Sequence, residues 1–324
     1  MADPFQPEIS ATVQPRQEDV AFDLDKVLSS VVSLTSQVPL DAHSAATLGP
    51  ERQGNGVLIR DDLVLTVGYL ITEAETIWLI GNNGKATLAH AVGSDQATGF
   101  ALVQALQPLD LPPIELGNSA ALSVGERVIV AGHGGRNQAI KARVITKQEF
   151  AGYWEYVLDE AIFTAPAHPN WGGTAIIAGD GTLRGIGSLF VQEGPPGNAP
   201  VDGNMVIPID LLKPILDDIM QYGSTKQPPR PWLGMSTMEA DEKLVVASLS
   251  KGGPAQMADI RIGDFVIEIA GEQVDSLAGM FRRIWSLGSA GVEVPLTIYR
   301  DGALIGVNVQ SGNRADRLKS PRLH

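Results

Sequence analysis

One stretch of the sequence constrains the fold more than any other. Thr164-Ala-Pro-Ala-His-Pro-Asn-Trp-Gly-Gly-Thr-Ala-Ile-Ile177 joins two apolar runs through a Pro-Asn turn and a Gly-Gly pair. Short apolar runs on either side of a tight turn are typical of strands. Adjacent glycines let the backbone adopt positive φ angles and approach another segment closely. The pattern therefore predicts a β-rich fold with a sharp, closely packed loop at this point.

The composition agrees with a β-rich chain of more than one domain. At 324 residues, two or three domains are expected, and 35 Gly with 21 Pro indicate many turns. The net charge of −13 disfavours nonspecific binding to nucleic acid and to anionic membranes. The absence of cysteine excludes disulfides and cysteine metal sites. We expect no metal, no cofactor, no nucleic-acid partner and no membrane insertion.

The N-terminal sequence bears on the cellular location. Met1-Ala-Asp-Pro-Phe-Gln-Pro-Glu8 has neither a basic segment nor the apolar segment of a secretory signal. No stretch approaches about 20 uninterrupted apolar residues, so no transmembrane helix is expected. The sequence as written predicts a cytoplasmic protein, and a periplasmic one if the N-terminus has been trimmed.

The Gly172-Gly173 stretch resembles the active-site loop of trypsin-like serine proteases of the HtrA (DegP-type) family. That loop has the form Pro-Gly-Asn-Ser-Gly-Gly-Pro-Leu. When the glycine pairs are matched, the nucleophile position holds Trp171, and the residue that supplies an oxyanion N–H is Pro169. Trp has no nucleophilic atom and Pro has no N–H. The resemblance therefore implies a family site without its chemistry.

The other two triad positions are also altered. In the family, a Thr-x-x-His motif carries the catalytic histidine, and Tyr69 stands in that place after Thr66. The strand of the form Asp-x-x-x-Asp-Leu-Ala matches Asp95 at its first acid and Gly99 at its second. The losses at Tyr69, Gly99 and Trp171 follow the family order His, Asp, Ser.

The C-terminal part resembles a PDZ domain. Trp232-Leu-Gly-Met235 is similar to the carboxylate-binding turn of HtrA-type PDZ domains, and Gly253-Pro-Ala begins their second motif, with Asp259 at a frequent Gly position. The resemblance implies that the peptide adds a strand to the sheet edge and places its carboxylate on Leu233, Gly234 and Met235. Phe281 and Ile284 are candidates for the apolar side-chain pocket, and a role as core residues alone is the alternative.

The predicted fold is mainly β: a trypsin-like double six-stranded β-barrel followed by an α+β PDZ domain. The predicted segments are a flexible arm (1–24), a protease-fold domain (25–223) with a closing helix at about 210–221, a linker (224–231), a PDZ domain (232–312) and a basic tail (313–324). Asp210 is the predicted N-cap of the closing helix. Family resemblance also implies trimers formed through the N-terminal part, with Phe5 and Phe22 as candidate contacts.

Three functions compete. The first is an inactive relative that binds peptide C-termini or unfolded segments, as a scaffold, a chaperone-like holder in protein quality control, or a regulator of an active protease paralogue. The second is a serine-type endopeptidase with a relocated site, whose candidate groups are Thr174, Ser94, His168 and Tyr69. The third is a purely structural subunit of an oligomer. Large aromatic side chains usually pack, so we expect Trp171 to be buried in the former substrate cleft; an exposed aromatic anchor for a partner is the alternative.

Overall fold

The computed structural model describes residues 8–193, 199–240 and 243–319, which form two compact units. Unit 1 holds described residues 8–148, 160–193 and 199–225. Unit 2 holds 149–159, 226–240 and 243–319. The chain therefore leaves unit 1 after Gln148, returns to it at Glu160, and enters unit 2 again at Lys226.

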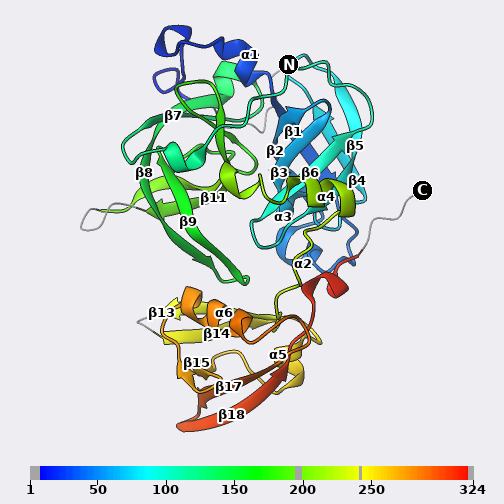
Figure 1. Cartoon of the computed structure of the whole chain (residues 1–324), viewed down its shortest axis with the longest axis vertical. Helices are drawn as coiled ribbons and strands as arrows, with labels where there is room; N and C mark the ends of the chain where they lie inside the picture. Colours follow the sequence, from blue (N-terminus) through cyan, green and yellow to red (C-terminus); the bar gives the residue numbers. More distant parts are fainter. Residues whose placement is uncertain (1–7, 194–198, 241–242, 320–324) are drawn as a thin grey trace. The chain divides into compact units, whose positions relative to one another are not determined.

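Six antiparallel strands of unit 1 close into a first barrel in the order β1-β2-β3-β6-β5-β4 (Figure 1). Their bounds are β1 Val31–Gln37, β2 Glu51–Arg60, β3 Leu63–Val67, β4 Thr76–Ile80, β5 Ala86–Ser94 and β6 Phe100–Ala105. Side chains such as Leu34, Leu65 and Phe100 are fully buried in unit 1. Every residue of β3 is buried, which explains why the strand is apolar except at Thr66, whose hydroxyl donates to the Asn55 carbonyl at 2.8 Å.

A second closed barrel of unit 1 has the order β10-β11-β12-β9-β8-β7. Its strands are β7 Arg127–Ala131, β8 Ala139–Gly152, β9 Tyr156–Ala165, β10 Ala175–Ile177, β11 Leu183–Glu193 and β12 Val201–Pro208. The strands β8 and β9 extend past the barrel, so the end of this hairpin belongs to unit 2. Residues 164–177, which include the Gly172-Gly173 pair, run from the end of β9 through β10.

The N-terminal segment differs from the predicted flexible arm. Ile9 is only 7% exposed and lies in a buried apolar cluster with second-barrel residues such as Val130 and Ile162. The amide of Lys141 donates to the carbonyl of Val13 at 2.7 Å, and a short 3-10 helix, η1, covers Gln17–Asp19. The ring of Phe22 lies against Gly181. The arm is ordered from residue 8 because it packs on its own barrel; Phe5 lies outside the described residues.

The predicted closing helix is shorter than expected and is broken. A 3-10 helix, η4, covers Ile209–Leu211, and the α-helix α4 covers Leu216–Tyr222. Pro214 lies between them, and proline both lacks an N–H and disfavours helical geometry in the residue before it. Asp210 is therefore not the N-cap of α4, a position held by Ile215. Its carboxylate instead accepts hydrogen bonds from the Ser119 hydroxyl and the Ala120 amide, at 2.8 and 2.9 Å.

The rest of the described part of unit 1 contains three more short α-helices and two more 3-10 helices. They are α1 Leu24–Leu28, α2 Ala45–Leu48, α3 Gly68–Ile71, η2 Ser119–Ala121 and η3 Gly135–Gln138. Of these, α3 matters for the site because it carries Tyr69.

Unit 2 contains a sheet in the order β13-β14-β15-β17-β18, with β16 paired to β15. Its elements are β13 Met235–Ala240, β14 Lys243–Leu249, α5 Pro254–Met257, β15 Phe265–Ile269, β16 Glu272–Gln273, α6 Leu277–Ser286, β17 Glu293–Arg300 and β18 Ala303–Gln310. Ser276 caps α6, since its hydroxyl accepts from the Gly279 amide at 3.3 Å. Apolar residues of α6 at helical spacing, including Met280, Phe281 and Ile284, are buried.

The described part of the predicted basic tail ends at Lys319. A 3-10 helix, η5, covers Arg314–Arg317. The Arg314 guanidinium donates to the carbonyl of Trp154 at 3.0 Å, and the Arg317 guanidinium lies 5.9 Å from the ring centre of Trp232. These contacts place the first part of the predicted tail within unit 2. The two barrels, the sheet and α6 confirm the predicted fold class.

Candidate functional site

The loop between β9 and β10 is held from within by His168. Its amide donates to the Asn204 side chain at 2.6 Å, and its Nδ1 accepts from the Asn170 amide at 3.1 Å. Because Nδ1 is an acceptor, the proton lies on Nε2, which donates to the Gln138 carbonyl at 3.1 Å. Burial lowers the pKa of His168, and its two backbone hydrogen bonds only partly oppose this shift. His168 is therefore a neutral structural residue with both ring nitrogens engaged.

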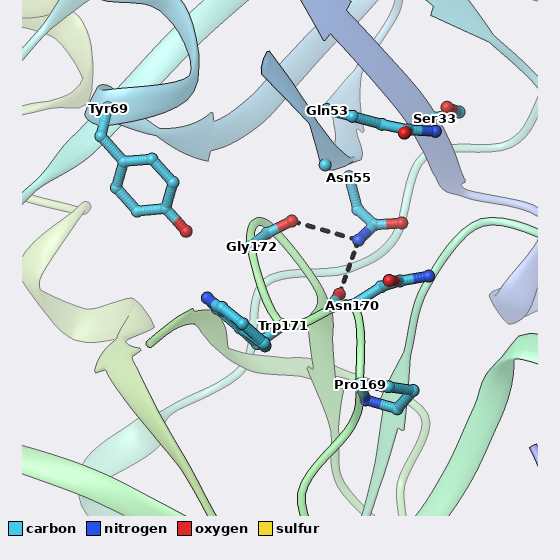
Figure 2. A pocket seen from close by; sticks show the side chains of 9 residues that line it. Ser33, Gln53, Asn55, Tyr69, Pro169, Asn170, Trp171 and Gly172 are labelled. Carbon is cyan, nitrogen blue, oxygen red and sulfur yellow. Dashed lines mark hydrogen bonds between the residues drawn. The ribbon is translucent and has the colours of Figure 1, made fainter. Parts of the chain in front are cut away.

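Asn55 of β2 fastens the same loop from the first barrel. Its Nδ2 donates to the carbonyls of Asn170 and Gly172 at 3.0 and 3.1 Å (Figure 2). Its Oδ1 accepts from the amide of His133 at 2.8 Å. Asn55 is buried, and its side-chain amide uses both N–H donors and its carbonyl oxygen in hydrogen bonds. Asn55 was not among the predicted site residues, and its position between Gly54 and Gly56 is the local signal that could have indicated it.

The Gly-Gly pair is required by close packing, as predicted. The amide of Asn55 donates to the Gly172 carbonyl at 2.8 Å. Gly173 has φ of 78°, and a Cβ built there would lie 1.8 Å from the Asn55 carbonyl oxygen. No side chain fits at that position.

Tyr69 and Trp171 lie beside each other. The phenol of Tyr69 donates to the Ser188 carbonyl at 2.7 Å. Burial raises the pKa of Tyr69, and a hydrogen bond with the Trp171 side chain opposes the shift only weakly. A neutral phenol that is committed to a carbonyl cannot take a proton at neutral pH. Tyr69 therefore does not replace a histidine as the base.

Gly99 is adjacent to this pair but carries no acid. Its φ is 84°, and its carbonyl accepts from the amide of Gly68, the residue before Tyr69, at 2.8 Å. The nearby Asp95 uses its carboxylate on the Thr98 amide at 2.8 Å, within its own turn. The structure thus brings the predicted positions 69, 99 and 171 into one neighbourhood, and none of the three supplies a carboxylate.

Trp171 is more exposed than predicted. Its exposed fraction is 37%, and its ring is tilted against that of Phe190, with the two centres 5.8 Å apart. The expectation of a buried Trp171 is wrong, because the loop held by Asn55 turns the indole to the rim of a pocket rather than into the core.

The pocket has a volume of about 260 Å³. It is lined by Ser33, Gln53, Gly54, Asn55, Tyr69, Pro169, Asn170, Trp171 and Gly172. Figure 2 shows the side chains from β2, α3 and the loop around it. None of the lining residues is charged, and the volume is below the usual range for small-molecule sites. The described residues hold no group of three or more His, Asp and Glu placed to bind a metal ion.

Three of the four candidates for a relocated hydrolase site, Thr174, His168 and Tyr69, have their side chains engaged in hydrogen bonds. Thr174 is fully buried and its hydroxyl donates to the Trp171 carbonyl at 2.9 Å. Ser94 is exposed at the end of β5, and its amide donates to the Gly223 carbonyl. With His168 and Tyr69 engaged as described, no described hydrogen bond joins two of these four candidates as nucleophile and base.

The predicted peptide-binding residues lie at one end of the sheet in unit 2. Gly234 has φ of 70°, and the carbonyl of Leu233 accepts from the Ala255 amide at 2.8 Å. Met235 begins β13, which is an edge strand of the described sheet. Phe281 and Ile284 are 1% and 3% exposed and belong to one buried apolar cluster with Leu233 and Met235. Their role in a side-chain pocket stays a prediction. Asp259 has φ of 61°, which agrees with the predicted turn at a frequent Gly position.

Two family models match the chain. A trypsin-like peptidase domain matches residues 54–186, and a PDZ domain matches residues 231–310. The domain organisation is of the HtrA/DegP type. Among the described residues of this HtrA-type chain, no helix has the length and apolar character needed to cross a membrane.

Similar curated proteins are named as proteases. A probable periplasmic serine endoprotease DegP-like of Halomonas elongata is 27% identical over 288 residues, which cover 82% of this chain and 57% of that protein. The periplasmic serine endoprotease DegP of Escherichia coli K12 is 25% identical over 277 residues, covering 79% and 56%. The HtrA-type chain thus spans little more than half the length of these relatives.

Solved structures share the fold. The HtrA-type protease AlgW with decapeptide matches with a TM-score of 0.53 and 19% identity, covering 92% of this chain and 98% of that one. A serine endoprotease from Yersinia pestis matches with a TM-score of 0.51 and 21% identity, covering 91% and 99%.

Proposed function

We propose that this HtrA-type chain is proteolytically inactive and binds peptide C-termini or unfolded segments through its PDZ domain. The proposed inactivity rests on the residues that occupy the four positions that would perform catalysis. Trp171 stands for the nucleophile, Tyr69 for the base, Gly99 for the orienting acid and Pro169 for an oxyanion donor.

Each lost group removes a separate step of acyl transfer. No hydroxyl at residue 171 can attack a carbonyl, and the neutral Tyr69 phenol is bound to Ser188 rather than free to accept a proton. A developing oxyanion would lack the N–H that Pro169 cannot supply. Proteases without a triad keep weak catalysis through an intact oxyanion hole, and here the hole is damaged as well.

The protease names of the relatives favour the alternative, a serine endopeptidase with a non-standard site. The engagements of Thr174, His168 and Tyr69 argue against it, because each would have to give up a buried hydrogen bond to react. A structural subunit without an activity is the third alternative.

Peptide binding is supported by the edge of the sheet in unit 2. An edge strand such as β13 can accept a peptide strand, and the turn before it contains a left-handed glycine, Gly234. We propose that the partners are protein C-termini or unfolded segments, among them those of an active protease paralogue. A homotrimer and a chaperone-like role in protein quality control are further parts of this proposal.

The cellular location is also a proposal. The names of the relatives place those proteins in the periplasm and favour that compartment for this chain. The cytoplasmic location expected from the N-terminal sequence stays a prediction, and residues 1–7 lie outside the described part.

The decisive test is incubation of the purified chain with a fluorescently labelled unfolded protein for hours, beside a serine-reactive phosphonate probe. An active HtrA-type protease serves as the positive control. We expect neither cleavage nor labelling. Cleavage that follows the chain through purification would overturn the proposal, and the labelled residue would identify the relocated nucleophile.

Trp171→Ser is expected to stay inactive. The new hydroxyl has no base beside it, because Tyr69 is neutral, and no complete oxyanion hole. Loss of the triad base alone lowers kcat by about 10⁶-fold in a serine protease. Turnover in the same cleavage assay should therefore stay at the level of Phe190→Ser, a control that places a serine at the neighbouring exposed aromatic. Measurable turnover by Trp171→Ser alone would show that a base has been overlooked.

A further inference from the structure

The end of the β8–β9 hairpin packs within unit 2. The strands β8 and β9 pair in the second barrel, whereas residues Glu149–Asp159 belong to the same compact unit as Lys226–Lys319. We call Glu149–Asp159 the hairpin tip. Its contacts fall on the residues that were predicted to bind a peptide.

A carboxylate of the tip lies on the predicted carboxylate-binding turn. Oε1 of Glu155 accepts from the amides of Leu233 and Gly234, at 3.3 and 3.2 Å. The amide of Met235 also forms a hydrogen bond with this carboxylate. Glu155 has φ of 63°, a left-handed conformation that is uncommon for a residue with a side chain. The tip therefore holds its carboxylate in place with an unusual backbone conformation.

An apolar residue of the tip joins the core of unit 2. Val157 is 7% exposed and belongs to the buried apolar cluster that includes Leu233, Met235 and Phe281. Ala151 packs against the same cluster. A carboxylate on three amides beside a buried apolar side chain is the combination that a peptide C-terminus presents to such a groove.

Polar contacts flank this arrangement. Arg282 of α6 forms ion pairs with Glu149 and Asp159 of the tip. Arg314 of η5 donates to the Trp154 carbonyl and attracts the Glu155 carboxylate. Ion pairs between partly exposed side chains contribute little free energy. The Arg282 pairs therefore affect the orientation of the tip more than the strength of its docking.

We propose that the hairpin tip is an internal ligand of the peptide groove, with Glu155 in the place of a peptide's terminal carboxylate. This inference rests on the proposed peptide binding. Three amides cannot hold two carboxylates at once, because like charges at contact distance repel strongly. A peptide C-terminus therefore binds only by displacing the tip, and its apparent affinity is reduced by the fraction of chains in which the tip is docked.

The test measures binding of a library of fluorescein-labelled decapeptides with free C-terminal carboxylates by fluorescence anisotropy, at pH 8. Glu155→Ala removes the carboxylate of the tip. This variant is expected to bind the peptides selected from the library about tenfold more tightly than the unchanged chain does. Glu155→Gln keeps an acceptor oxygen for the amides and should not show this gain. Glu160→Ala, on β9 just outside the tip, is the matched control. Peptides with an amidated C-terminus should bind more weakly than those with a free carboxylate, both to the unchanged chain and to each variant.

The outcomes separate the two proposals. Equal affinities of the unchanged chain and Glu155→Ala would overturn the internal ligand and leave peptide binding standing. Absence of binding to both proteins across the whole library would overturn the proposed function itself. Should Glu155→Ala fail to fold, hydrogen exchange of the unchanged chain decides. Saturating peptide must then raise the exchange of amides 151–157, and unaltered protection would contradict displacement.

The docked tip should also respond to pH. Burial raises the pKa of Glu155 to about 7, against the opposing effects of Arg314 and of the amides of Leu233, Gly234 and Met235. An undocked glutamate titrates near a pKa of about 4.3, so the docked form binds the extra proton between these values. Docking therefore weakens as pH rises through this window, and it does not change further above it. Peptide carboxylates remain ionised throughout the upper part of the window.

Between pH 5 and pH 8 we expect the affinity of the unchanged chain for a selected peptide to rise about tenfold relative to that of Glu155→Gln, which cannot titrate at residue 155. Anisotropy titrations at both pH values, on the two proteins in parallel, measure this ratio. A ratio that stays constant with pH would show that Glu155 is not the titrating group.

Discussion

Gly173→Ala is expected to destabilise unit 1 by about 3 kcal/mol or more, since overpacking costs about 1–3 kcal/mol and a left-handed alanine about 1–2 kcal/mol. The added methyl group would lie 1.8 Å from the carbonyl oxygen of Asn55, and backbone atoms cannot rotate out of its way. For a unit of this size the melting temperature should fall by about 6–12 °C. Differential scanning calorimetry measures the fall, and hydrogen exchange of the barrel amides assigns the transition to unit 1.

Gly179→Ala is the matched control for this variant. It lies in the turn after β10, no atom outside its immediate neighbours lies within 4 Å of its built Cβ, and its φ is not positive. It should melt within about 2 °C of the unchanged chain. Equal melting of Gly173→Ala and Gly179→Ala would mean that the loop does not approach β2 as described.

Asn55→Asp should destabilise unit 1 by about 3 kcal/mol at pH 8, because it leaves buried polar groups without their donor. The substitution keeps the shape and the acceptor for the His133 amide but replaces the amino group that donates to the Asn170 and Gly172 carbonyls. A buried carboxylate would then face two carbonyl oxygens, and each of these loses its donor. Urea unfolding, followed by hydrogen exchange of the barrel amides of unit 1, measures the change.

The sign of the pH effect distinguishes this explanation from general disruption. Protonation gives the introduced carboxyl group an O–H donor, so the folded state holds a proton that the unfolded state releases, and the penalty should shrink between pH 8 and pH 5. Gln53→Glu, which adds the same charge two residues away on an exposed side chain of β2, should cost less than about 0.5 kcal/mol. A penalty for Asn55→Asp that does not vary with pH would contradict the proposed hydrogen-bond clash.

The fold was largely predictable because its signals are local or repeat a family pattern. The two barrels were predicted from the resemblance to the HtrA family, and the left-handed turn at Asp259 agrees with the turn chemistry expected of an aspartate. The predicted start of the closing helix was wrong. The prediction gave more weight to the apolar spacing of this segment than to Pro214, although proline favours the start of a helix and disfavours its interior.

The site was predictable only in part, because its decisive contacts join residues far apart in the sequence. The altered triad positions come together as their order in the chain suggested. Asn55, however, acts on a loop more than 100 residues away, and Glu155 lies on a turn nearly 80 residues later. No local pattern marks such a partner. The exposure of Trp171 was missed for the same reason, since the loop that turns it outward is fastened by Asn55.

The backbone of Gly99 bears on whether single substitutions could restore a catalytic triad in a chain that is proposed to be inactive. A return to an active triad needs an acid at this position, yet Gly99 has φ of 84° and binds the Gly68 amide through its carbonyl. A residue with a Cβ is strained at this φ, and an aspartate less than most, as the left-handed Asp259 shows. No single substitution is expected to raise the rate of proteolysis, whether it introduces an aspartate at residue 99, a histidine at 69 or a serine at 171. Selection for proteolysis would therefore favour none of them alone. If the chain is inactive, single substitutions would not restore its proteolytic activity.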